Sequence, residues 1–201
     1  MPADGRSVLF SVAHSRVTGG ARPPQDGTVA PFTEYDVSLR ASLAAFRTLA
    51  GRAQVEIFDC GAASSDREYA RLKTARVNQC RPTLAIEIHC NSAADPRPNY
   101  SEVIYYAGSV TGRAAAQFVA NSLRAGFLSE GIQAPVHGAR ANTIQQDGKS
   151  FFFLEDTLGA SIIVEGVFIS NHEHARWLSN GGAEMYGTFV AEGILEWLGL
   201  K

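Results

Sequence analysis

The chain is poor in cysteine and has no long apolar run. It contains 201 residues and three cysteines, Cys60, Cys80 and Cys90, whose odd number and irregular spacing argue against a disulfide framework. No apolar stretch approaches the roughly 18–20 residues that a membrane-spanning helix needs. Internal repeats and low-complexity tracts are also missing from the sequence. The sequence therefore argues against a disulfide-stapled miniprotein, a repeat array and a membrane span.

Charge of one sign is not in excess either. The 18 Lys and Arg residues nearly balance the 20 Asp and Glu residues, which leaves a net charge of −2. A nucleic-acid-binding protein would be expected to show a basic face. The first residues, Met-Pro-Ala-Asp-Gly-Arg, also lack the basic region, apolar stretch and cleavage site of a signal peptide. We expect no nucleic-acid partner, synthesis in the cytoplasm, and any later export by another route.

Apolar sequence sufficient for a core is present. Hydrophobic residues make up 45% of the chain and charged residues 19%, an ordinary balance for a globular protein. A chain of this length can bury a substantial core without disulfide staples. Because no linker composition interrupts it, we expect a single domain over residues 1–201.

Segments with strand and helix periodicity alternate along the chain. Strands are expected at residues 7–13, 53–58, 83–88, 102–106 and 161–165, and residues 151–154 fit either a strand or a helical turn. Helices are expected at about 34–50, 66–80 and 112–128 and near the C-terminus, where apolar residues from Met185 to Leu198 form a broad face. This alternation predicts an α/β fold with an at least partly parallel sheet.

The first expected helix has start and packing signals. Thr33 followed by Asp36 resembles a capping box, with Asp in place of Glu. Leu39, Leu43 and Phe46 recur at helical spacing. The helix is therefore expected to begin next to Thr33 and to present these apolar residues on one face.

Three expected strands end on residues that can carry chemistry. His14 follows the strand at 7–13, His89 follows that at 83–88, and Glu165 follows residues 161–164. Ligands in open α/β sheets collect beyond the carboxyl ends of the strands, so these side chains should meet. Two histidines and a carboxylate can hold a catalytic zinc with one open position, and a further glutamate can act on the bound water. With Glu34 as the fourth candidate, the pattern suggests a hydrolase.

Each candidate also has a purely structural interpretation. A histidine at a strand end can be a polar terminus, and Glu34 at a helix start favours the positive end of the helix dipole. No local H-E-x-x-H spacing makes a metal site specific. Cys90 should face away from the group that His89 addresses and be a buried structural cysteine. His172 and His174 are expected to be solvated at a helix start, and His137 to lie in a loop that can line a groove.

Several segments in sequence order resemble the zinc-dependent N-acetylmuramoyl-L-alanine amidases of the Amidase_3 type. The similar segments are residues 8–14 with Gly19-Gly20, residues 33–39, residues 72–78, residues 85–92 (A-I-E-I-H-C-N-S, like the S-I-H-x-N stretch of the family) and residues 164–171 (V-E-G-V-F-I-S-N, like V-E-x-G-F-I-S-N with the glycine one place earlier). The G-H-G-G run of the family differs here, because His14 lies in A-H-S-R with the glycines displaced. The loop at 15–33 is therefore expected to give the site an unusual rim.

The resemblance implies one zinc per chain, with His14, Glu34 and His89 as ligands and Glu165 as the catalytic glutamate. It also implies a mixed, mostly parallel sheet of about six strands flanked by helices. The expected activity is hydrolysis of the amide between N-acetylmuramic acid and L-alanine in peptidoglycan, by a phage or prophage endolysin without a separate wall-binding domain. A zinc exopeptidase and a non-catalytic wall-binding module with a degenerate site are the alternatives.

Some relatives carry an inserted helix that blocks the zinc until a partner displaces it. The connection from the strand at 102–106 to the next helix spans only about residues 107–111, which is too short for such a helix. The loop at 15–33 and residues 131–149 are interrupted by Pro and Gly. We therefore expect that no activator protein is required.

Overall fold

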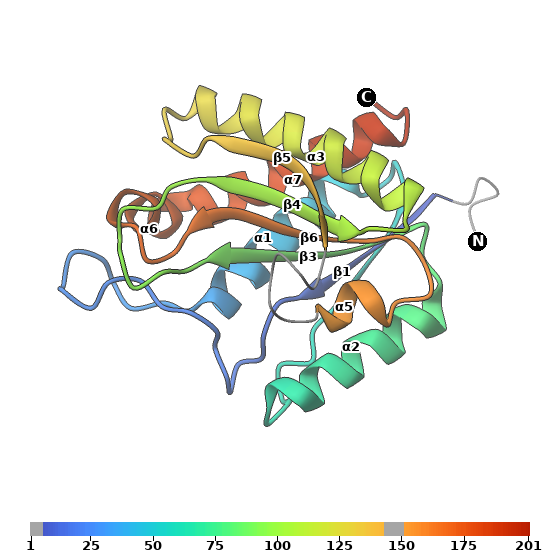
Figure 1. Ribbon diagram of the computed structural model, residues 1–201, viewed down its shortest axis with the longest axis horizontal. Coiled ribbons are helices and arrows are strands. Elements are labelled where there is room, and N and C mark those ends of the chain that lie inside the picture. The colour runs from blue at the N-terminus through green and yellow to red at the C-terminus, as the bar shows by residue number, and fades with distance from the viewer. Residues whose placement is uncertain (1–5, 143–150) are drawn as a thin grey trace.

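A mixed β-sheet lies between two layers of helices in the computed structural model, which describes residues 6–142 and 151–201 (Figure 1). The strands are β1 (Ser7–Val12), β2 (Gln54–Phe58), β3 (Leu84–Asn91), β4 (Ser101–Tyr106), β5 (Val136–Asn142) and β6 (Ser161–Phe168). Their order in the sheet is β2-β1-β3-β6-β4-β5. All neighbours are parallel except β4 and β6, which are antiparallel. The expected mixed, mostly parallel six-stranded sheet is confirmed.

Helices of unequal size cover the two faces of the sheet. The helices are α1 (Glu34–Leu49), α2 (Asp66–Cys80), α3 (Val110–Ser129), α5 (Phe152–Glu155), α6 (His172–Trp177) and α7 (Ala183–Trp197), with a π-helical turn η1 (Leu178–Gly182) before α7. Helices α1, α3 and α7 pack on one face over the main apolar core, whereas α2 and α5 cover part of the other face (Figure 1). The second face is therefore the one with room for a site.

Helix α1 begins as expected, and small residues line much of its buried face. The Thr33 side chain accepts from the backbone of Asp36, and the Asp36 side chain accepts from the backbone of Thr33, which confirms the capping box. Leu43 and Phe46 are each 37% exposed, whereas Ala41 and Ala45 are fully buried. The reason is the close approach of α7, since a Cβ on Gly187 would lie 2.0 Å from the carbonyl oxygen of Ala41. Small residues, and not Leu43 or Phe46, form the contact between α1 and α7.

One further expectation, at the β4–β5 edge, needs correction. His137 was expected in a loop, but it lies in β5, where Gly138 with φ of 98° marks the register shift against β4. Of the two alternatives for residues 151–154, the structure has the helical one, the short helix α5. The sequence V-H-G-A-R-A-N offers little β-branched alternation, so pairing with β4 and packing on α3 determine this strand.

A tyrosine from α7 shapes the active end of the sheet. The Tyr186 hydroxyl accepts from the N–H of Gly166 over 2.7 Å and lies 3.0 Å from the carbonyl oxygen of His89. A Cβ on Gly166 would lie 2.3 Å from the Tyr186 ring, so only glycine fits there. The register of β3 and β6 shifts just beyond, between His89 and Asn91. The early glycine of the V-E-G stretch thus makes room for Tyr186 between the two strands.

None of the helices in residues 6–142 and 151–201 combines the length and apolarity needed to cross a bilayer. Residues 1–5, which contribute to the expectation about a signal peptide, lie outside the described residues.

Candidate metal centre

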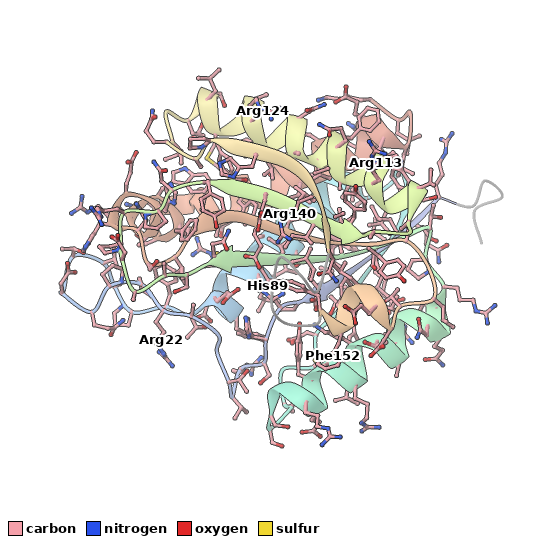
Figure 2. All side chains as sticks on the ribbon, in the orientation of Figure 1. Arg22, His89, Arg113, Arg124, Arg140 and Phe152 are labelled. Atoms are coloured by element: carbon pink, nitrogen blue, oxygen red, sulfur yellow. The ribbon has the colours of Figure 1, made fainter. Side chains whose placement is uncertain are left out.

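The structure brings His14, Glu34 and His89 together beyond the ends of β1 and β3. One ligand atom from each residue lies within 4.8 Å of the other two. His14 follows β1, Glu34 is the first residue of α1, and His89 lies near the end of β3. Glu165 is the register neighbour of His89 on β6. All four candidates therefore gather at one end of the sheet, and Figure 2 shows His89 there beside the segment that carries Phe152.

Glu34 is buried at the centre of this group. Its carboxylate oxygens lie 3.0 Å from Nε2 of His14 and 2.9 Å from Nδ1 of His89. The backbone N–H groups of Ala21 and Cys90 each donate to it over 3.0 Å. Burial alone would raise the pKa of Glu34, but the hydrogen bonds from the two histidines hold it well below its usual value. The carboxylate is therefore ionised and fixed in orientation.

The turn after β1 is shaped to bring glycine against the histidine. His14 has a φ of 60°, in the left-handed region that few non-glycine residues adopt. Gly20, with φ of 70°, packs so closely that a Cβ there would lie 2.5 Å from Cδ2 of His14 and 2.8 Å from Oε2 of Glu34. The glycines are displaced along the sequence, but Gly20 still forms the cradle of the histidine in space.

His89 is held through both ring nitrogens. Nδ1 faces Glu34, and Nε2 lies 3.3 Å from Oε2 of Glu87. Burial alone would lower the pKa of His89, but the hydrogen bonds to Glu34 and Glu87 raise it to about 10. A metal that binds at Nδ1 must therefore displace a proton. Glu87 was not among the candidates from the sequence, although the alternation Glu87-Ile88-His89 places both polar residues on one face of the strand.

A cavity of about 340 Å³ opens onto this centre. Its lining includes His14, His89, Glu87 and Glu165 together with apolar residues such as Ile163. The side chain of Glu165 thus faces the same space as the two histidines. The cavity offers metal ligands, a carboxylate able to exchange a proton, and walls that are partly apolar.

The other candidates stay outside this group. Cys90 is buried in the main core on the opposite face from His89, as expected. His137 stacks on Tyr100 with 4.7 Å between ring centroids. Nδ1 of His172 lies 3.3 Å from Oδ2 of Asp26. His174 was expected to be solvated, but it is fully buried and accepts the N–H of Phe168 through Nδ1.

The donor set suits zinc. Two imidazoles and one carboxylate are the ligands of many catalytic zinc sites that keep a fourth position open. The three donors already face a common centre, and backbone N–H groups and the Gly20 cradle hold them there. His14, Glu34 and His89 therefore fit the group that they would hold.

Comparison with known proteins identifies the family. The family model Amidase_3, N-acetylmuramoyl-L-alanine amidase, matches residues 11–196. No curated protein sequence gives a significant match. The fold is similar to that of the catalytic domain of the CD27L endolysin targeting Clostridia difficile, with a TM-score of 0.73 and 23% identity over 95% of this chain and 97% of that one.

Two further amidases of known structure share the fold. AmiC2 of Nostoc punctiforme is 22% identical over 97% of this chain and 98% of its own, with a TM-score of 0.73. The CwlD amidase from Clostridioides difficile, solved in complex with the GerS lipoprotein, is 13% identical over 98% of this chain and 100% of its own, with a TM-score of 0.77. Because the family model spans residues 11–196, the chain belongs to the Amidase_3 family of N-acetylmuramoyl-L-alanine amidases.

Proposed function

We propose that this peptidoglycan amidase is zinc-dependent, with one zinc held by His14, Glu34 and His89 and with Glu165 as the catalytic acid and base. The observation that carries the proposal is the convergence of the three donors and Glu165 on one cavity. The family is typically zinc-dependent, which supports the same assignment. The bond cleaved is the amide between the lactyl group of N-acetylmuramic acid and L-alanine.

The metal site and Glu165 have different roles in the proposed hydrolysis. When bound, zinc supplies a Lewis acid that polarises the scissile carbonyl and lowers the pKa of a coordinated water. Glu165 accepts a proton from the water whose oxygen adds to the carbonyl carbon. It then donates that proton to the alanine nitrogen as the C–N bond breaks, which gives a lactyl carboxylate and a free amino group. Apolar residues beside the site, such as Ile163, exclude water and strengthen these electrostatic effects.

Product analysis of digested sacculi tests the amidase assignment. We expect free alanine amino groups to appear at the rate at which the wall dissolves, without new reducing sugar ends, because the C–N bond is cleaved and glycosidic bonds are not. Dinitrophenylation followed by hydrolysis measures the amino groups, and a borohydride assay measures the reducing ends. Reducing ends that rise in step with solubilisation would assign the protein to glycosidases instead.

We further propose that the protein acts as a phage or prophage endolysin. The likeness to an endolysin catalytic domain of nearly equal extent supports this role. Expression in a host cell should cause lysis only when a holin is co-expressed, because the holin gives the enzyme access to the wall. Turbidity measured with and without the holin tests this, and rapid lysis without any holin would argue for another delivery route.

We also propose that the enzyme needs no protein activator. Among residues 6–142 and 151–201, the connection from β4 to α3 is short, and the loop from β1 to α1 contains no helix. Residues 131–149 are the third segment considered for a blocking helix. Of these, residues 131–142 form a turn and β5, and residues 143–149 lie outside the described residues. Purified zinc-loaded protein should therefore digest sacculi by itself. A protein that stays inert with zinc bound until a partner is added would contradict this.

A further inference from the structure

A buried ionic cluster lies beside His89, on the side of the imidazole away from Glu34. Glu87 on β3 is 1% exposed and Lys73 on α2 is 6% exposed. The ammonium nitrogen of Lys73 lies 2.7 Å from Oε1 and 2.8 Å from Oε2 of Glu87. The hydroxyl of Tyr69 donates to Oε1 over 2.6 Å, and that of Ser11 donates to it over 3.2 Å. Donors from α2 and β1 thus hold the Glu87 carboxylate in one orientation.

The cluster is ionised and internally neutral. The Lys73 ammonium lies against both oxygens of the Glu87 carboxylate, and the hydroxyls of Tyr69 and Ser11 donate to one of them, so the carboxylate acts as an acceptor toward all three groups. The Lys73 ammonium also lies 4.3 Å from the centre of the Tyr69 ring and 5.2 Å from that of Phe153. A buried ion pair of this kind adds little net stability, because desolvation offsets the attraction. Stability alone therefore does not account for it.

The geometry indicates which nitrogen of His89 would keep its proton when a metal binds. Oε2 of Glu87 lies 3.3 Å from Nε2. An ionised carboxylate only accepts hydrogen bonds, so Nε2 must be the donor. Nδ1 lies on the other side of the ring, 2.9 Å from Oε1 of Glu34, so without a metal it also faces an acceptor. A metal held by His14, Glu34 and His89 would take the place of the proton on Nδ1, and Nε2 would stay protonated toward Glu87. The Glu87 carboxylate, which Lys73, Tyr69 and Ser11 hold in place, thus orients the imidazole of His89 from the side opposite Glu34.

We propose that Glu87 is a positioning residue of the metal centre, which fixes His89 as the Nε2–H tautomer and directs Nδ1 to the position shared with His14 and Glu34. Lys73 and Tyr69 act through Glu87 by holding its carboxylate. The inference rests on the proposed zinc site and adds a residue to it. In the S-I-H-x-N stretch that residues 85–92 resemble, a serine stands where this chain has Glu87.

The competing explanation is that Glu87 only neutralises the buried Lys73. Two double variants separate the roles. Lys73→Met with Glu87→Gln removes both charges but keeps an amide oxygen that can accept from Nε2 of His89. Lys73→Met with Glu87→Leu removes both charges and the acceptor. Because both partners of the ion pair are removed in each case, neither variant leaves an unpaired buried charge.

The measured quantity is the zinc dissociation constant, determined by competition with a chromophoric chelator, together with the melting temperature of the apoprotein. The positioning role predicts a constant within a few-fold of wild type for the glutamine variant and one raised by about 10–100-fold for the leucine variant. Glu56→Gln with Arg76→Met is the matched control, because this pair also joins a strand glutamate to a cation of α2 but lies away from the site. It should leave the zinc constant unchanged.

Equal zinc affinity in the two Lys73/Glu87 variants would overturn the positioning role while leaving the zinc site intact. A wild-type protein that binds no zinc would overturn the site and the positioning role together. A measurement on the unaltered protein does not depend on the folding of the variants. The ring ¹⁵N spectrum of zinc-loaded protein should show His89 protonated at Nε2, and protonation at Nδ1 instead would refute the proposal.

Discussion

Replacing Glu165 by glutamine is expected to lower turnover by about 10²–10⁴-fold, the usual contribution of general acid–base catalysis. Glutamine keeps the size of the side chain and much of its hydrogen bonding, but its amide accepts no proton from the attacking water. Glu165 lies outside the group of three metal donors, so zinc content and melting temperature should stay near wild type. Turnover on purified sacculi, metal analysis and a thermal melt together measure these quantities.

Glu102 provides the matched control for Glu165. It is the register neighbour of Glu165 on β4, but its carboxylate is held by Arg140 over 2.8 and 3.1 Å. Glu102→Gln should therefore change turnover far less than Glu165→Gln. A structural role for Glu165 predicts instead that zinc affinity or stability falls together with activity. Turnover within a few-fold of wild type in a zinc-loaded Glu165→Gln protein would remove this residue from the mechanism.

Much of this site was predictable from strand endings. His14, His89 and Glu165 each follow an apolar run, and parallel strands deliver such residues to one edge of the sheet. Glu34 is different, because a glutamate at a helix start is common and no spacing distinguishes it. It becomes part of the site because the loop before α1 brings Gly20 against His14 and the N–H of Ala21 onto the Glu34 carboxylate, which sequence periodicity does not reveal.

Packing and burial at two places depend on partners distant in sequence. The helical spacing of Leu39, Leu43 and Phe46 does not identify the packing face of α1, because Gly187 of α7 approaches Ala41 so closely that only small residues fit between the helices. His174 was expected in solvent, but its imidazole accepts the backbone N–H of Phe168. In both cases a partner distant in sequence determines the outcome. Local propensity is informative where the segment itself supplies the interactions, as in the Thr33 capping box.

The second large effect is expected from removal of a ligand histidine. His89→Ala or His14→Ala takes away one of three protein donors, and zinc content should fall well below one per chain. Activity should fall with it by roughly 10³-fold or more, because the Lewis acid contributes several kcal/mol to the transition state. Metal analysis of protein purified without added zinc, followed by sacculus digestion, measures both losses.

His89→Ala and His14→Ala should differ in melting temperature. A third variant, His172→Ala, should lose no zinc. His89 is anchored by Glu87 and Glu34, so His89→Ala also leaves the buried Glu87 carboxylate without one of its donors and should lower the melting temperature more than His14→Ala. His172→Ala removes a contact with Asp26 outside the metal donor group, and this variant should keep one zinc per chain. Full zinc retention in both His14→Ala and His89→Ala would show that the metal is bound elsewhere or not through imidazole.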